Sequence, residues 1–182
     1  MTNGELKYYS KLLETKQETY DMLPKDIQME QDIIEIAIKL DLNNLFEVPD
    51  EADYKKAVLY AFNIISRSMN LNEDYYYESN DALLDDQYKR LDFLEKAVSN
   101  KSIRNDVDVI TQAIELGAEI CEFTAQNAKT YDMEEEATEC VEKGQDLIDS
   151  IYSLYASSCK SRKDFLKVQK SFNQNIEKLK NA

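Results

Sequence analysis

The sequence contains no histidine and no tryptophan among its 182 residues. Without histidine the chain has no Ser-His or Cys-His nucleophile pair, lacks the commonest general base, and lacks the usual ligand of zinc, haem and di-iron centres. Chemistry based on carboxylates and magnesium remains open. We therefore expect a binding protein rather than an enzyme, with no cofactor and no metal site.

Glycine and proline are also scarce, with three glycines and two prolines in the whole chain. Sheet proteins need many tight turns, and tight turns are built largely from these residues. Their scarcity favours long helices joined by short polar links. It also excludes the glycine-rich loops that bind phosphate in P-loop and dinucleotide-binding proteins.

Cysteine occurs three times, at Cys121, Cys140 and Cys159, and these residues form no CxxC pair, which excludes a zinc ribbon. We expect free, buried thiols in a reducing compartment. The chain has no run of about 18 apolar residues, and its first residues show no apolar signal segment. The sequence therefore predicts a soluble protein of the cytoplasm with no membrane partner.

Apolar residues recur along the chain at the three- and four-residue spacing of a helix, which predicts an all-α fold, a bundle of six to seven helices. Asp50 and Asp132 are the expected N-caps of two helices. A polar stretch near residues 70–80 divides the chain into an N-terminal unit, 1–70, and a C-terminal unit, 71–182, with a single domain as the alternative. The predicted helices span residues 4–22, 24–40, 50–65, 80–98, 102–128, 132–151 and 162–179, with a loop at 43–49.

The predicted helices at 102–128 and 132–151 are separated by only a few residues, so we expect them to form an antiparallel hairpin. Gly117 and Gly144 fall in the middle of these helices, on the apolar side. A glycine in that position costs about 1 kcal/mol relative to alanine. We expect close approach of the two helices at both glycines as the compensation.

Charge is strongly negative and unevenly distributed. The formal net charge is −14, which disfavours direct binding to nucleic acid or to an anionic membrane. Residues 105–149 hold thirteen acidic residues against Lys129 and Lys143, whereas residues 160–182 hold seven basic residues against Asp164 and Glu177. The expected partner is therefore basic: a nucleic-acid-binding protein or a ribonucleoprotein.

Within the acidic segment the carboxylates follow helical spacing. Five of them are spaced by 4, 3, 4 and 3 residues in the helix predicted at 132–151, which places them in one continuous stripe on the side opposite the apolar residues. The preceding helix carries a shorter stripe, and in a hairpin the two could lie side by side. The residues are Glu135, Glu139, Glu142, Asp146 and Asp149 in the longer stripe, and Asp108, Glu115, Glu119 and Glu122 in the shorter one.

Tyrosine is the commonest aromatic residue, and Tyr75, Tyr76 and Tyr77 are consecutive. No helix or strand can bury three consecutive side chains on one face, so at least one is expected to be exposed, where it would suit contact with a protein partner. A loop held down by its own aromatic side chains is the alternative.

The predicted last helix, 162–179, is basic and amphipathic. Its apolar residues suit packing within the same bundle. Alternatively it could bind the acidic face of a second copy, which would make the protein a structural or adaptor oligomer.

One enzymatic alternative remains. Residues 135–139 read Glu-Glu-Ala-Thr-Glu, which matches the EExxE motif of magnesium-dependent all-α nucleotide pyrophosphatases. Those proteins carry a second acidic element, ExxD, on the following helix. Here the nearest candidates, Glu142 and Asp146, have a different spacing and belong to the same predicted helix.

In overall composition and in its two acidic stripes, the chain resembles small phage and mobile-element proteins that inhibit bacterial defence enzymes. These are the anti-CRISPR proteins, including Cas9 inhibitors of the DNA-mimic class. The resemblance implies a phage-encoded inhibitor in a bacterial cytoplasm that occupies the basic nucleic-acid channel of its target. The leading hypothesis is thus a binding protein whose acidic helical surface inhibits a nucleic-acid-handling protein, such as a CRISPR effector nuclease.

Overall fold

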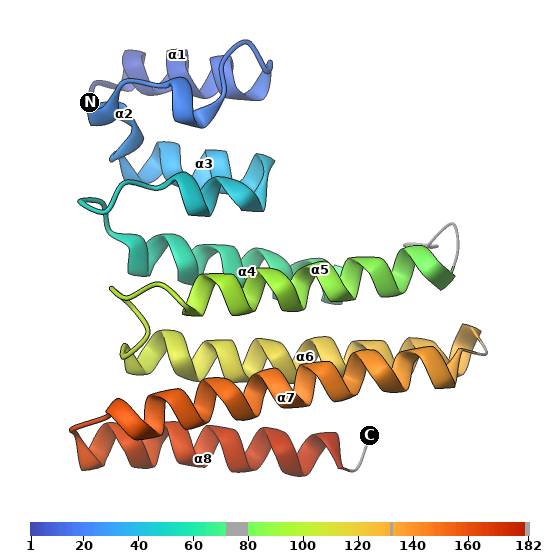
Figure 1. Cartoon of the computed structure of the whole chain (residues 1–182). Coiled ribbons are helices and arrows are strands. Elements are labelled where there is room, and N and C mark those ends of the chain that lie inside the picture. Colours follow the sequence, from blue (N-terminus) through green and yellow to red (C-terminus); the bar gives the residue numbers. More distant parts are fainter. Residues whose placement is uncertain (72–79, 132, 181–182) are drawn as a thin grey trace. The chain divides into compact units, whose positions relative to one another are not determined.

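The computed structural model describes residues 1–71, 80–131 and 133–180, and every regular element in these ranges is a helix (Figure 1). The all-α prediction is confirmed. The α-helices are α1 (Asn3–Glu14), α2 (Lys25–Gln28), α3 (Gln31–Leu40), α4 (Tyr54–Leu71), α5 (Asn80–Val98), α6 (Val107–Tyr131), α7 (Glu134–Ser158) and α8 (Arg162–Leu179), and the short 3₁₀ helices are η1 (Tyr20–Met22) and η2 (Leu42–Glu47).

The chain divides into two compact units, Met1–Ile64 and Ile65–Ala182. The division falls inside α4, whereas the sequence suggests a division after residue 70. The first unit contains α1 to α3 with η1 and η2. The second contains α5 to α8, which carry all the acidic stripe residues.

The predicted helix at 4–22 is shorter in the structure, where α1 ends at Glu14. The hydroxyl of Thr15 donates to the carbonyl of Lys11, and Lys16 adopts a left-handed backbone conformation with φ of 55°. A left-handed residue cannot continue a right-handed helix. The chain therefore turns back, and Tyr20, at 1% exposure, is buried in η1 rather than on the predicted helix.

The predicted helix at 24–40 is divided into α2 and α3. The side-chain amide of Gln28, the last residue of α2, donates to the carbonyls of Tyr20, Asp21 and Leu23, at 3.2, 2.9 and 2.8 Å. In return, the hydroxyl of Tyr20 donates to the carbonyl of Gln28 at 2.5 Å. This buried polar cluster fixes the turn between η1 and α2, and α3 begins only at Gln31.

Two further boundaries of the first unit differ from the sequence prediction. The predicted loop at 43–49 contains η2, whose Leu45 is fully buried. Asp53, not Asp50, accepts from a backbone amide at the start of α4, from the N–H of Lys56 at 3.2 Å. Asp53 is the residue directly before the first helical residue, Tyr54, which is the position that a capping side chain occupies.

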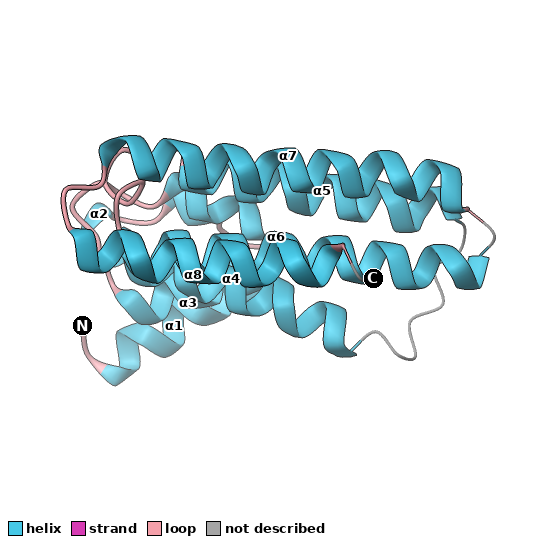
Figure 2. Ribbon diagram, turned by 90° about the horizontal axis from the view of Figure 1, so that it is seen from below, coloured by secondary structure: helices cyan, strands magenta, loops and turns pink. Residues whose placement is uncertain are grey.

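In the second unit, α6 packs against α5, α7 and α8, and the four helices run alongside one another (Figures 1 and 2). The core is made of fully buried aliphatic residues from every helix: Leu91, Leu94, Ile114, Ile148 and Val168. The connections from α6 to α7 and from α7 to α8 are short, so consecutive helices are antiparallel.

The starts of α6 and α7 also differ from expectation. The first residue of α6 is Val107 rather than residue 102, because the carboxylate of Asp106 accepts from the N–H groups of Asp108 and Val109 at 3.0 and 3.2 Å. The N-cap of α7 is Met133, without a side-chain cap bond. The predicted cap, Asp132, lies outside the described residues. α7 continues to Ser158, past the predicted end at 151.

None of the helices that the structure describes combines the length and the apolar character needed to cross a membrane.

Candidate binding surfaces of the α5–α8 bundle

The α6–α7 hairpin is closely packed at its two glycines, as the sequence predicts. A β-carbon on Gly117 would lie 2.9 Å from Cγ1 of Ile148, and one on Gly144 would overlap Sγ of Cys121. Both added β-carbons would lie closer to their neighbours than ordinary van der Waals contact allows. Gly117 and Cys121 therefore define the side of α6 that faces α7, and Gly144 and Ile148 define the side of α7 that faces α6.

The three cysteines are free thiols, and two of them are buried in this interface. Cys121 and Cys140 are each 1% exposed, whereas Cys159 is half-buried. Burial raises the pKa of Cys121 to about 12 and also raises that of Cys140. The nucleophilic thiolate form is thereby suppressed at both sites.

A thiol-labelling experiment tests this burial. At about pH 8 we expect an aromatic disulfide reagent to modify Cys159 in the native protein and to spare Cys121 and Cys140, with all three reacting after unfolding. Peptide mass spectrometry identifies the labelled sites. Labelling of Cys121 in the native protein as fast as that of Cys159 would contradict the packing.

The raised pKa of Cys121 also predicts a pH dependence of stability. Because this pKa is higher in the folded state, the unfolded state loses the thiol proton first as pH rises above about 8.5, and the free energy of unfolding falls.

The longer acidic stripe lies on the exposed side of α7. Its five residues, hereafter the α7 stripe, are all exposed: Glu135, Glu139, Glu142, Asp146 and Asp149. Gly144 and Ile148, which face α6, lie on the opposite side of the helix, as the residue spacing requires. At 1.5 Å per residue the stripe is about 21 Å long.

The single basic residue of α7 does not neutralise this stripe. Lys143 pairs with Asp92 of α5 at 2.7 Å, and its Nζ lies 5.1 Å from the centre of the Tyr88 ring. Both contacts direct the lysine sideways onto α5. Among the described residues, no ion pair involves any of the five carboxylates of the α7 stripe. The stripe is a row of uncompensated negative charge.

The shorter stripe, hereafter the α6 stripe, consists of Asp108, Glu115, Glu119 and Glu122 and lies beside α8. Lys167 of α8 pairs with Asp108 at 2.8 Å. The hydroxyl of Ser171, also on α8, donates to Glu115 at 3.3 Å. The α6 stripe is therefore partly neutralised within the chain.

The two stripes do not lie side by side. By helical spacing the α7 stripe is on the side of α7 opposite Gly144 and Ile148, although Glu142 also lines a hollow with Cys121 of α6. The α6 stripe is on the side of α6 away from Gly117 and Cys121, which face α7. The tight contact at Gly117 and Gly144 fixes the rotation of α6 and of α7 about their own axes. The hairpin thus presents one uncompensated row of carboxylates, not a double row.

The basic helix α8 packs within its own chain. Phe172 of α8 stacks on Tyr152 of α7, with ring centroids 4.1 Å apart, and Val168 is fully buried. Together with the Lys167–Asp108 pair, these contacts confirm the prediction that this helix suits intramolecular packing.

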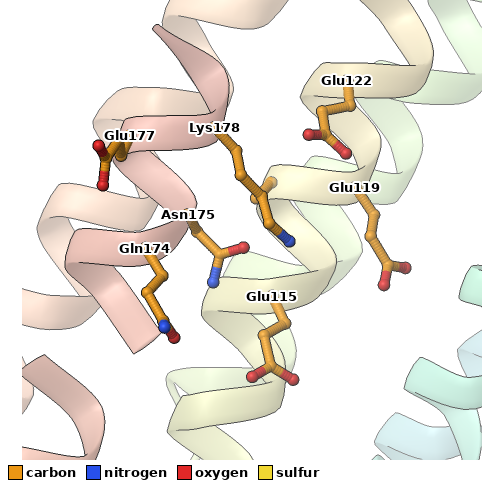
Figure 3. Close-up of a pocket in the computed structure, with 8 residues that line it drawn as sticks. Glu115, Glu119, Glu122, Gln174, Asn175, Glu177 and Lys178 are labelled. Carbon is orange, nitrogen blue, oxygen red and sulfur yellow. The ribbon is translucent and has the colours of Figure 1, made fainter. Parts of the chain in front are cut away.

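A polar groove, the α6–α8 groove, runs between α6 and α8 with a volume of about 650 Å³. Figure 3 shows Lys178 reaching from α8 toward α6, with its amino end between Asn175 and Glu119 in this view. The α6 side of this groove consists of stripe residues that the sequence already indicated, Glu115, Glu119 and Glu122, whereas its α8 side was not predicted because its polar residues do not form a motif. One signal was present: Ser171 and Asn175 share the helix side of the buried Val168. The lining residues are Glu115, Ala118, Glu119, Glu122, Gln174, Asn175, Glu177 and Lys178.

Two further predicted features are the three consecutive tyrosines and the EExxE motif, which shares Glu135 and Glu139 with the α7 stripe. Tyr75, Tyr76 and Tyr77 lie outside the described residues. The EExxE motif at residues 135–139 lies in the first turns of α7, where its glutamates are exposed. In the part of the chain that the structure describes, no three Cys, Asp or Glu side chains converge as metal ligands would.

Comparison with protein-family models, with curated proteins and with solved structures gave no match to this chain.

Proposed function

We propose that this chain is a non-enzymatic inhibitor of a nucleic-acid-handling protein, such as a CRISPR effector nuclease. In this proposal the α7 stripe occupies a Lys/Arg-lined groove of the target in place of a nucleic-acid backbone. The observation that carries the proposal is that the five carboxylates of this stripe are exposed and have no cation partner in the described residues, while Lys143 is held by Asp92.

The spacing of the stripe supports a phosphate-like role. Successive carboxylates are separated by three or four residues, which is about 4.5–6 Å along the helix axis. Phosphates on one DNA strand recur about every 3.4 Å along the duplex axis. With one row rather than two, the α7 stripe corresponds to a single backbone strand and not to a duplex.

The stripe also has an energetic cost. Like charges four residues apart destabilise a helix by about 0.2–0.5 kcal/mol per pair. The stripe contains four consecutive pairs of neighbouring carboxylates, and their repulsion does not stabilise α7. The stripe is therefore not explained by the stability of the helix. Binding to a basic surface would relieve this repulsion, and electrostatic attraction would accelerate association.

The test is a competition experiment with a stripe variant in which each carboxylate becomes its amide. A fluorescent single-stranded DNA complementary to the guide is bound to a guide-RNA-loaded CRISPR effector nuclease, and its displacement by this chain is followed by anisotropy. We expect the wild-type chain to displace the DNA, less well at high salt, and the variant to lose displacement. The substitutions are Glu135→Gln, Glu139→Gln, Glu142→Gln, Asp146→Asn and Asp149→Asn.

A matched control separates the stripe from net charge. The control variant also neutralises three exposed glutamates and two exposed aspartates, all in the first unit, and it should displace DNA as the wild type does. Equal displacement by the stripe variant and the wild type would contradict the proposal, and no displacement by the wild type would exclude this class of target. The control substitutions are Glu14→Gln, Asp26→Asn, Glu47→Gln, Asp50→Asn and Glu51→Gln.

A further inference from the structure

The interface between α6 and α8 is unusual in having polar residues where a bundle normally places aliphatic ones. Ser171 and Asn175 of α8 are only 7% and 6% exposed. They follow the buried Val168 on the same side of the helix. A pair of leucines at these two positions would close the interface against α6 and gain hydrophobic burial. Asn175 instead lines an open groove of about 650 Å³, and Ser171 lies one turn before it on α8.

Asn175 carries an acceptor that no described residue uses. Its side-chain nitrogen donates to the carbonyl of Ser171 at 2.9 Å and to the hydroxyl of Ser171 at 3.3 Å. The bond to the carbonyl fixes the orientation of the amide, because a carbonyl can only accept. The Oδ1 of Asn175 therefore points away from Ser171, toward α6 in Figure 3, and accepts no hydrogen bond in the described part of the chain.

The groove surrounding this oxygen is negatively charged. Glu115, Glu119 and Glu122 line it from α6, spaced by four and three residues along one side of that helix. Glu115 is held in place by the hydroxyl of Ser171. Lys178 is the only basic residue that lines the groove, and none of the ion pairs in the described residues involves it.

We propose that the α6–α8 groove binds an alkylammonium or guanidinium group. The cation would donate to Oδ1 of Asn175 and to the carboxylates of α6, which are the acceptors that such a group needs. Two sources supply this chemistry: a small polyamine, or a lysine or arginine side chain of a basic polypeptide. The proposal is independent of the α7 stripe, because the two surfaces lie on different helices and face different directions.

The experiment uses the full chain with spermidine and, in a parallel arm, with an end-blocked oligolysine peptide. Binding is measured by calorimetry, and its position by the side-chain amide resonances of Asn175 in heteronuclear NMR spectra. We expect at least one of the two cations to shift the Asn175 amide resonances. A shift by spermidine alone identifies a polyamine site, and a shift by the peptide alone identifies a site for a basic polypeptide.

Two isosteric triple variants provide the comparison. The groove variant, Glu115→Gln, Glu119→Gln and Glu122→Gln, removes three charges while leaving an oxygen acceptor for Ser171, and it should weaken binding about tenfold or more. The control, Glu135→Gln, Glu139→Gln and Glu142→Gln, removes the same charge from α7 and should bind as the wild type does. A third variant, Lys178→Gln, should strengthen binding about threefold by removing a competing cation.

Three outcomes would overturn the proposal. The first is equal weakening in both triple variants, which would show attraction to net charge only. The second is binding that leaves the Asn175 resonances unmoved, which would place the cation elsewhere. The third is absence of binding by both probes. Because this experiment involves no nuclease, its result does not depend on the inhibitor proposal. Failure of the groove proposal would likewise leave the inhibitor proposal unchanged. Circular dichroism confirms that each variant is folded.

Discussion

Replacing Gly144 by alanine is expected to destabilise the second unit by about 2 kcal/mol, although alanine is the better helix former by about 1 kcal/mol. The added methyl group would overlap Sγ of Cys121, which is itself buried and donates to the carbonyl of Val141 at 3.7 Å. The hairpin would have to open at its tightest point. Urea unfolding followed by far-ultraviolet circular dichroism measures the change.

A double-mutant cycle makes this prediction specific. In a Cys121→Ala background the sulfur is absent, so the Gly144→Ala methyl group fills the vacated space and should stabilise the helix by about 1 kcal/mol. The coupling between the two sites is then about 3 kcal/mol, near the upper limit for neighbouring residues. Gly4→Ala is the control, because the nearest atom, Oγ1 of Thr2, lies at an ordinary 3.9 Å. Additive effects at residues 121 and 144 would contradict the close approach.

The Gln28→Leu substitution is expected to destabilise the first unit by about 3 kcal/mol. Leucine has a similar size but no donor, so the carbonyls of Tyr20, Asp21 and Leu23 would lose their shared partner. Each buried carbonyl left without a hydrogen bond costs about 1–3 kcal/mol. The Asp21 carbonyl is only partly buried, so water can bond to it in the variant and its share of the cost is smaller. Hydrogen exchange of the amides in residues 20–40 reports on this unit without interference from the second.

Two comparisons define the role of Gln28. Tyr20→Phe removes only the hydroxyl that donates to the Gln28 carbonyl, and it should cost about 1 kcal/mol. Gln17→Leu makes the same chemical change at an exposed glutamine of the same unit and should alter stability by less than about 0.5 kcal/mol. If Gln28→Leu behaved like Gln17→Leu, the three hydrogen bonds would not be what holds the turn.

The arrangement of the stripes changes the expected target of the chain. A double row of carboxylates would fit a channel built for duplex DNA. A single uncompensated row about 21 Å long fits a groove that tracks one strand. The α6 stripe is instead engaged by Lys167 and Ser171 of α8, so a partner that binds α7 need not displace α8.

Sequence periodicity was sufficient to predict the long helices of the second unit. α5 and α8 occupy the predicted ranges, and the α6–α7 hairpin follows from the short link between two long amphipathic segments. The first unit was predicted less well. α1 ends near Lys16, whose left-handed backbone turns the chain, and α2 ends at Gln28, whose side chain bonds to backbone carbonyls of the preceding turn. Such local contacts are not visible in the spacing of apolar residues along the sequence.

The sequence by itself determined the fold class, the spacing of the carboxylates and the side of each helix on which they lie, because helical geometry converts spacing directly into direction. Only the tertiary structure decided which neighbour each side faces. The contact of Gly144 with Cys121 sets the rotation of α7 against α6 and so separates the two stripes. Ser171 and Asn175 became a candidate site only when α8 was seen to place them opposite the carboxylates of α6. That juxtaposition joins residues more than fifty positions apart in the chain, and packing alone brings them together.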